Sequence, residues 1–380
     1  MSADSTPEPG TPGESGTTSP PEGAERRPRP RSRRRKALLA AVWTVVGIVV
    51  LGGSGVCYLY FRLNGNLRSV DINSLLGHDR PEDVDNGSED ILVLGSDSRS
   101  GGNAKLGGGE DDGTARADTA MIVHLYEGRS RAGVVSIPRD TLVDRPGCTG
   151  TDGRAHPGAT DVMFNSAYTV GGAACAVKTV ESMTGIRMDH YVEIDFAGFA
   201  ELVDRLGGVR ITTTEDIDDP DSHLDLKAGE HTLDGAQALG LVRTRHGVGD
   251  GSDLGRIQLQ QAFLKALVDQ VGDVGVLTSP RKLYDLADTA TGAVTTDSEL
   301  GSVRDLASFA DGLKGLGSAR MTMLTMPVRL DPADANRLLV DEPRAQQVWK
   351  ALRADRPVPP SATDGTPQGT ADGVVGSGGR

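Results

Sequence analysis

The chain has 380 residues, a formal net charge of −13 at pH 7 and 50 glycines. The length would allow two average domains, but both ends differ in composition from the middle, so we expect one folded core domain. The negative charge argues against nucleic acid as a partner.

Both ends of the chain lack the apolar side chains that a folded segment needs. Residues 1–36 consist largely of Pro, Gly, Ser, Thr, Glu and, towards the end, arginine. Residues 357–380 open with Pro357, Pro359 and Pro360 and continue in Gly, Ala and Thr. Such segments bury too little apolar surface to offset the entropy cost of ordering, so we predict disordered ends.

An apolar run at residues 37–61 predicts one transmembrane helix. The run is longer than the roughly 20 apolar residues that cross a bilayer. A cleaved signal peptide is the alternative, but its apolar region usually has only about 7–15 residues and does not follow so long a basic preamble.

Basic residues before the run predict its orientation. They form a dense group: Arg26, Arg27, Arg29, Arg31, Arg33, Arg34, Arg35 and Lys36. Only Arg62 and Arg68 follow closely, so the positive-inside rule places residues 1–36 in the cytoplasm and the chain after residue 61 outside the cell. A nucleic-acid arm or a localisation signal is the other interpretation of the group. Its position beside the span favours orientation, with the lipid bilayer as a partner.

The cysteines agree with this topology. Cys57 falls inside the apolar run, which leaves Cys148 and Cys175 as a pair in an oxidising compartment. We predict a disulfide between them, with two separate thiols as the alternative.

Residues 62–88 mix charges with Gly, Asn and Asp and are interpreted as an extracellular stalk. From there on, expected strands alternate with expected helices. The strands are residues 91–94, 120–126, 132–137, 191–194, 209–212 and 321–326. The helices are residues 164–183, interrupted at Gly171-Gly172, then 196–206, 234–242, 257–271, 280–287 and 300–313. This order predicts an α/β/α layered domain with a central mixed sheet at residues 89–330, followed by a helical segment at 331–356.

Charged side chains lie where the expected strands begin and end. Arg116 and Asp118 directly precede one strand, and Arg139 follows the end of the next. If these two strands are antiparallel neighbours, Arg116 and Arg139 lie at the same edge of the sheet.

More cations follow further along the chain. In an extended conformation Arg243 and Arg245 would project to the same side, because the strand period is two. Asp253 begins the next polar group, in which Arg256 and Gln260 are four residues apart and share a helix face. A solvated salt bridge is the ordinary interpretation of any one arginine. Several guanidinium groups at element ends instead favour an anion such as phosphate.

The carboxylates suggest a metal. Asp97 and Asp118 stand at expected strand ends, and carboxylate oxygens suit Mg²⁺, which often bridges a protein to substrate phosphates. Either residue could instead orient an arginine or cap a turn. Together with the arginines they are typical of a phosphoryl-transfer centre, in which metal and guanidinium groups stabilise a leaving pyrophosphate.

These motifs resemble the LytR-CpsA-Psr cell-wall proteins. The matching segments are residues 91–99, 116–119, 136–141 with the string SIPRDT, 243–246 with RTRH, and 253–261 with DLGRIQLQQ. The resemblance covers residues 88–275. It implies a phosphotransferase that moves a glycopolymer, such as teichoic acid or arabinogalactan, from a polyprenyl pyrophosphate carrier onto peptidoglycan through a phosphodiester bond.

The resemblance also implies roles for individual residues. It implies Mg²⁺ at Asp97 and Asp118. The residues with implied catalytic roles are Arg116, Arg139, Arg243, Arg245, Asp253, Arg256 and Gln260. It implies a pyrophosphate surrounded by arginines, which are Arg99, Arg116, Arg139, Arg243, Arg245 and Arg256. A membrane-bound protein that binds polyprenyl pyrophosphate or glycan without turnover is the alternative function.

Two positions depart from the family pattern. Met163 stands where members usually have a lysine, two residues before Asn165, and Leu259 stands where many carry an arginine. Both departures imply fewer cations near the expected site.

Overall fold

The computed structural model describes residues 33–96, 117–249, 251–273, 280–364, 371 and 373–378. Three predicted site residues, Asp97, Arg99 and Arg116, lie outside these described residues, as does most of the expected N-terminal tail. The chain divides into two compact units, Met1–Cys57 and Tyr58–Arg380.

Helix α1, Arg33–Asn66, contains the apolar run. Its stretch Lys36–Asn66 is, within the described residues, the one helix long and apolar enough to cross a membrane. Large apolar side chains along it, such as Trp43, Leu51 and Phe61, are exposed. That exposure is consistent with a single-pass anchor, because lipid would cover such a surface.

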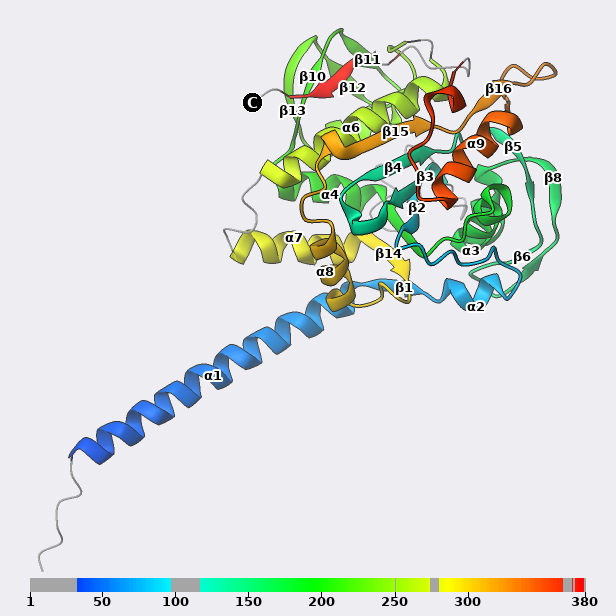
Figure 1. The fold of residues 1–380 in the computed structure, drawn as a ribbon. Coiled ribbons are helices and arrows are strands. Elements are labelled where there is room, and N and C mark those ends of the chain that lie inside the picture. The colour runs from blue at the N-terminus through cyan, green and yellow to red at the C-terminus, as the bar shows by residue number, and fades with distance from the viewer. Residues whose placement is uncertain are drawn as a thin grey trace, which may run out of the picture. The chain divides into compact units, whose positions relative to one another are not determined.

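A seven-stranded sheet forms the centre of the second unit (Figure 1). Its order is β1 (Arg68–Val70), β14 (Val294–Asp297), β9 (His190–Asp195), β2 (Glu89–Ser96), β3 (Ala117–Leu125), β4 (Ala132–Ser136) and β15 (Met321–Thr325). Strand β3 is antiparallel to both of its neighbours, β2 and β4, whereas β2 is parallel to β9 and β4 is parallel to β15. The predicted mixed sheet is therefore confirmed.

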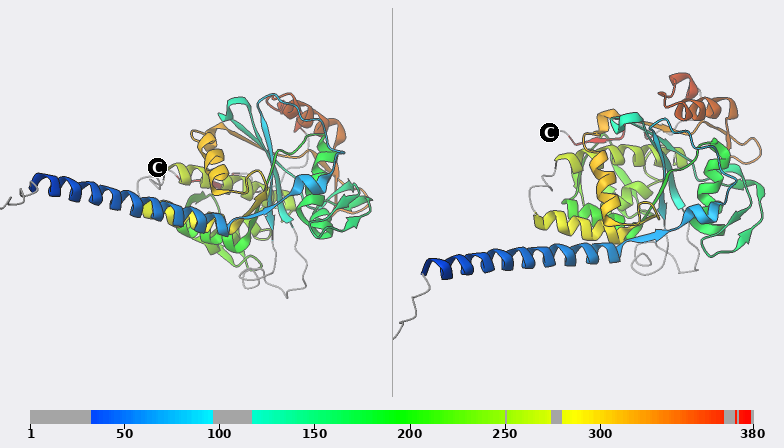
Figure 2. Two further views of the ribbon diagram at one scale, coloured as in Figure 1. Left: turned by 90° about the horizontal axis from the view of Figure 1, so that it is seen from below. Right: turned by 60° about the horizontal axis from the view of Figure 1, so that its bottom comes forward.

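Helices cover both faces of this sheet (Figure 2). One face packs against α2 (Ile72–Leu76), α3 (Asn165–Thr184) and α9 (Glu342–Arg353). The other carries α4 (Phe196–Leu206), α6 (Asp253–Asp273) and α8 (Val303–Gly312), with α5 (Gly235–Arg243) and α7 (Pro280–Ala293) packed on α4. The layers follow from strands that are apolar on both faces, since such strands need cover on each side.

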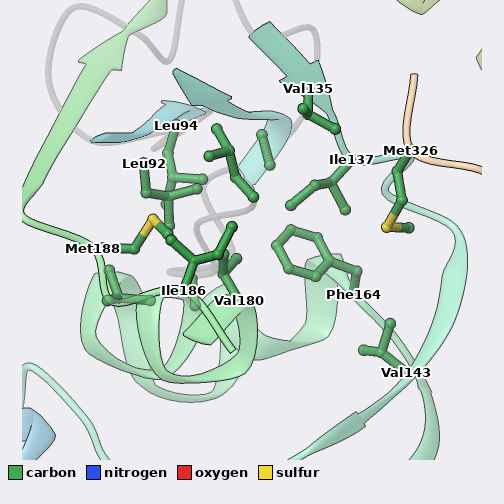
Figure 3. Packing of buried hydrophobic residues seen from close by; sticks show 14 of the residues in the cluster. Leu92, Leu94, Val135, Ile137, Val143, Phe164, Val180, Ile186, Met188 and Met326 are labelled. Atoms are coloured by element: carbon green, nitrogen blue, oxygen red, sulfur yellow. The ribbon is translucent and has the colours of Figure 1, made fainter. Parts of the chain in front are cut away.

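Alternation along the strands sorts the apolar side chains between the two faces. Leu92 and Leu94 of β2 lie in the main core with Val135 of β4, and Figure 3 shows these side chains directed towards Phe164 and Val180 of the α3 region. Ile91 and Val93 point to the opposite face, where α8 packs.

Smaller sheets flank the central one. They are β5 (Thr141–Arg145) with β8 (Ala159–Met163), β16 (Val328–Leu330) and β17 (Leu338–Val340); β6 (Cys148–Thr149) with β7 (Ala155–His156); β11 (Ile217–Asp219) with β12 (Leu224–Leu226); and β10 (Val209–Thr213) with β13 (Gly229–Leu233) and β18 (Val375–Ser377). A second core, which includes Ile211, Leu233, Leu241 and Phe263, joins β10 to β13 and helices α5 and α6.

The predicted domain boundaries, 89–330, are too narrow. The expected stalk contributes β1 to the central sheet and α2 to the main core, and its Arg80 pairs with the buried Glu181 at 3.1 Å. At the other end, Trp349 of α9 is fully buried, and β18 pairs with β10 inside the expected disordered tail. These segments have few apolar residues, and their burial depends on surfaces supplied by distant parts of the chain.

A disulfide joins Cys148 of β6 to Cys175 of α3, with 5.4 Å between their Cα atoms. It is the pair that the sequence predicted. Helix α3 is interrupted beside it, at Gly171 and Gly172, where φ is −149° and +65°. A Cβ at Gly171 would overlap the sulfur of Cys175, so the break makes room for the bond.

We expect Cys175→Ser to lower the free energy of unfolding by about 3–4 kcal/mol, because the lost bond closes a loop with a sequence separation of 27 residues. Urea unfolding of the wild-type protein and of Cys175→Ser, both in detergent, measures this loss. Cys57→Ser is the matched control, since Cys57 is a free, exposed cysteine in α1. Equal stability of Cys175→Ser and wild type would contradict the prediction.

A network of titratable groups holds the end of α9 to the sheet. The buried His124 of β3 places Nδ1 2.9 Å from Asp90 and Nε2 3.1 Å from Asp355. Burial lowers the pKa of His124, but the two carboxylates outweigh it and the pKa is raised overall. Asp189 accepts a hydrogen bond from the backbone N–H of Asp90, and burial raises the pKa of Asp189 to about 6 from its ordinary 3.8.

Asp189 should therefore make stability depend on pH. The folded protein binds the carboxyl proton of Asp189 more tightly than the unfolded chain does. The stabilisation of the folded state that results is complete below about pH 4 and is lost as the pH rises through about 6. We expect Asp189→Asn to flatten the urea-midpoint profile in that window and to be more stable than wild type at neutral pH. The exposed Asp311→Asn is the control. Parallel profiles for wild type and Asp189→Asn would rule out the raised pKa.

Candidate active site

Antiparallel pairing of β3 and β4 brings the start of one strand to the end of the other. Met121 pairs with Ser136, and the chain then turns, with the Thr141 N–H donating to the Pro138 carbonyl at 3.2 Å. This turn carries Arg139 back to the first residues of β3, where its Nη1 donates to Oδ1 of Asp118. The antiparallel pairing that this sheet edge requires is therefore present and brings Asp118 and Arg139 together, while Arg116 lies outside the described residues.

The first turn of α6 closes over this edge. Arg256 pairs through Nη2 with Oδ1 of Asp253, and the same nitrogen donates to the Asp118 carbonyl at 3.4 Å. Arg139 Nε and Arg245 Nη2 approach the same Asp253 oxygen, at 3.6 and 3.5 Å. Three guanidinium groups from three separate segments thus meet at one carboxylate oxygen.

Two glutamines join α6 to the sheet by hydrogen bonds. Gln260 Nε2 donates to Oγ1 of Thr119 at 3.1 Å and to the Val242 carbonyl at 2.9 Å. Gln261 Nε2 donates to Oγ of Ser136 at 2.9 Å. Gln260 thereby ties α6 to both β3 and the end of α5, which carry neighbouring parts of the site.

The expectation that Arg243 and Arg245 project together from an extended segment is wrong, because the backbone is not extended at Arg243. Arg243 is the last residue of α5, and its guanidinium carbon lies 5.3 Å from the centre of the Phe196 ring. Only after the cap residue Thr244 does the backbone leave the helix, and Arg245 then reaches Asp253. The period of two does not apply, because the helix ends between the two arginines.

Basic and acidic side chains are equal in number in this cluster. Arg139, Arg245 and Arg256 face Asp118, Asp140 and Asp253. Burial lowers the pKa of Arg139, but Asp118, Asp253 and Asp140 raise it further, so that its pKa is raised overall. Burial lowers the pKa of Arg256 despite Asp253, and burial together with Asp253 raises the pKa of Asp140. Sequence reasoning missed Asp140, although it lies inside the SIPRDT string.

Within the part of the chain that the structure describes, three buried polar atoms of the cluster have no hydrogen-bond partner. They are Nε of Arg139, Nε of Arg256 and Oδ2 of Asp253. An unsatisfied buried polar group costs about 1–3 kcal/mol, and more when it is charged. The two N–H groups can donate hydrogen bonds to the oxygens of an anion. The carboxylate oxygen is a suitable ligand for a cation such as Mg²⁺.

The two departures from the family pattern occupy different surroundings. Leu259 is buried in the second core with Phe263. Met163 is the last residue of β8, immediately before the segment that begins α3. The apolar residue at position 259 is thus explained by packing.

A family model, described as the LytR_cpsA_psr family, matches residues 59–354. The chain belongs to the LytR-CpsA-Psr family. The match includes β1, α2 and α9, so the family domain is wider than the sequence motifs suggested, in agreement with the packing of these elements.

Members of the family include relatives named for cell-wall assembly. The chain is 32% identical over 331 residues to the "Probable cell wall biosynthesis protein LcpB" of Corynebacterium glutamicum, covering 84% of this chain and 74% of that protein. It is 30% identical to the polyisoprenyl-teichoic acid–peptidoglycan teichoic acid transferase TagT of Bacillus subtilis, covering 87% of this chain and 99% of TagT. The solved structure of TagT bound to LI-WTA matches with a TM-score of 0.54 and 25% identity, over 76% of this chain and 98% of that one.

We expect Asp253→Ala to destabilise the protein by about 3–5 kcal/mol, because it leaves the buried Arg256 without its carboxylate. Inorganic pyrophosphate should recover part of the lost melting temperature, since an anion can neutralise the guanidinium groups. Glu201→Ala, which breaks an exposed pair with Arg205 on α4, should cost less than about 1 kcal/mol and show no recovery. Failure of pyrophosphate to stabilise Asp253→Ala would contradict an anion site.

Proposed function

We propose that this protein transfers a glycopolymer from a polyprenyl pyrophosphate carrier onto peptidoglycan, through a phosphodiester bond, during cell-wall assembly. The observation that carries the proposal is the convergence of Arg139, Arg245 and Arg256 on one oxygen of Asp253. Cations gather so closely only where negative charge neutralises them. Membership of a family that includes TagT supports the same reaction.

In the proposed reaction, the acceptor hydroxyl oxygen bonds to the phosphorus that carries the glycan. The bridging P–O bond of the pyrophosphate breaks, and polyprenyl phosphate leaves with the bridging oxygen. The hydroxyl proton passes to a base, for which the carboxylate of Asp140 at the sheet edge is a candidate. Guanidinium groups stabilise the charge that develops on the leaving phosphate, and they need no reorganisation because ion pairs already hold them.

Individual residues have distinct roles in this proposal. Arg139 and Arg256 each have an Nε group without a hydrogen-bond partner among the described residues, which could donate to the pyrophosphate, and Arg245, about one-third exposed, is the most accessible of the three cations. Arg99, Arg116 and Arg243 complete the predicted arginine set. Gln260 contributes by holding α6 against Thr119.

A magnesium ion fits the donor set. The cluster balances three arginines with three aspartates, so an added pyrophosphate brings excess negative charge that a divalent cation would compensate. Asp118, with Asp97, would hold the ion, and Oδ2 of Asp253 is a further oxygen without a hydrogen-bond partner. When bound, Mg²⁺ would polarise the phosphoryl oxygens.

The proposal includes the location of the protein. Helix α1 would anchor it in the cell membrane by a single pass, with a cytoplasmic N-terminus and the sheet domain outside. The Cys148–Cys175 disulfide supports an extracellular domain, because such bonds persist in oxidising compartments.

Purified protein incubated with a polyprenyl-pyrophosphate-linked glycan, Mg²⁺ and peptidoglycan should yield covalently linked glycan. Arg245→Ala and Arg243→Ala should each lower the transfer rate by about 10²–10³-fold, because each removes a cation from the leaving group. Arg205→Ala, on an exposed face of α4, is the matched control and should retain full transfer.

Two outcomes would count against the proposal. Full transfer by both active-site variants would show that these arginines do not act on the substrate. Tight binding of the carrier without any linked product would instead favour a membrane-bound binding protein.

A further inference from the structure

The hairpin formed by β11 and β12 contacts the backbone that presents Arg245. Asp219 lies at this junction, and only 1% of its surface is exposed. Its Oδ2 accepts hydrogen bonds from the N–H groups of Arg245, at 2.8 Å, and His246, at 2.9 Å. Its Oδ1 accepts from the N–H groups of Asp221 and Ser222, at 3.0 and 3.4 Å. One buried carboxylate therefore links the hairpin turn to the segment after α5.

Two more contacts fix the same junction. Ser222 Oγ lies 2.8 Å from Oγ1 of Thr244, the fully buried cap residue of α5. Gly247 has φ of +75°, and a Cβ there would overlap the carbonyl oxygen of Asp218. The hairpin thus touches the chain at residue 244, at residues 245 and 246, and at residue 247.

Arg245 connects this junction to the charged cluster. Its backbone N–H binds Asp219, while the Nη2 atom at the end of its side chain lies 3.5 Å from Asp253. Among the described residues, no ion pair joins Asp219 to a guanidinium group. Asp219 therefore holds Arg245 by its backbone and leaves the positive charge available.

We propose that Asp219 is a positioning residue for Arg245. This inference rests on the proposed function, since it assigns Arg245 to the pyrophosphate. A partly exposed arginine side chain loses much conformational freedom when it binds a phosphate, and a fixed backbone position reduces that loss. Displacement of a catalytic group by about 1 Å can cost on the order of 10²-fold in rate.

A second use of the same residues is metal binding. Ligand atoms of Asp219, Asp221 and His246 all lie within 4.8 Å of one another. Both oxygens of Asp219 already accept two backbone hydrogen bonds each, so hydrogen bonding accounts for its burial without an ion. His246→Ala separates the two uses, because a metal site needs the imidazole and the positioning role does not.

The test measures binding of farnesyl pyrophosphate, a soluble polyprenyl pyrophosphate, by calorimetry with the full chain in detergent. Asp219→Asn replaces one acceptor oxygen by an NH₂ group that faces backbone N–H donors, so it should weaken binding by about 10-fold or more. Asp225→Asn, an exposed change on the same hairpin, is the matched control and should bind like wild type. His246→Ala should also bind like wild type.

A double-mutant cycle separates positioning from a general loss of structure. In the Arg245→Ala background, Asp219→Asn should produce no further loss of affinity, because it acts through the arginine already removed. Additive losses, or wild-type binding by Asp219→Asn, would overturn the inference. An equal loss in His246→Ala would overturn it in favour of a metal site. Wild-type binding by Arg245→Ala would instead contradict the proposed function itself, so the two failures are distinguishable.

Discussion

The meeting of three guanidinium groups at Oδ1 of Asp253 is the interaction on which the rest of this structure depends. Arg139, Arg245 and Arg256 would repel one another without that shared carboxylate. Each arginine comes from a different element, so the site exists only when the sheet edge, the end of α5 and the start of α6 are held together.

Helix α6 joins the two cores that hold these elements. Its Leu254 packs in the main core beneath the sheet, whereas Leu259 and Phe263 pack in the second core with β10 and β13. Gln260 and Gln261 add polar contacts to β3 and β4 between these apolar anchors. Because residues of this one helix pack in both cores, the carboxylate at its start has little freedom to move relative to the sheet.

The polar network at the site is incomplete among the residues that the structure describes, since two guanidinium nitrogens and one carboxylate oxygen are buried there without hydrogen-bond partners. Some other buried charges have their partners, as Arg80 has Glu181 and Asp219 has four backbone N–H groups, but Oε2 of Glu89 and Nε2 of His156 have none among the described residues. Three such atoms lie together at the Asp253 cluster, so a charged ligand would relieve more unfavourable free energy there than at either single atom.

The sequence by itself determined many of the larger strands and helices around the central sheet, the apolar helix, the cysteine pair and the motifs that carry Asp118, Arg139, Asp253 and Arg256, because periodicity, composition and local strings report these directly. Tertiary structure alone decided that Arg243 ends a helix on Phe196, that Leu259 faces a core, that β14 joins the central sheet, and that residues 62–88, Ala371 and residues 373–378 contribute to the domain. The physical reason is that burial and charge pairing join residues far apart in the chain. Asp219 illustrates the difference. In the sequence it is one of several acidic residues in an expected turn, and only the fold brings it to the backbone of Arg245.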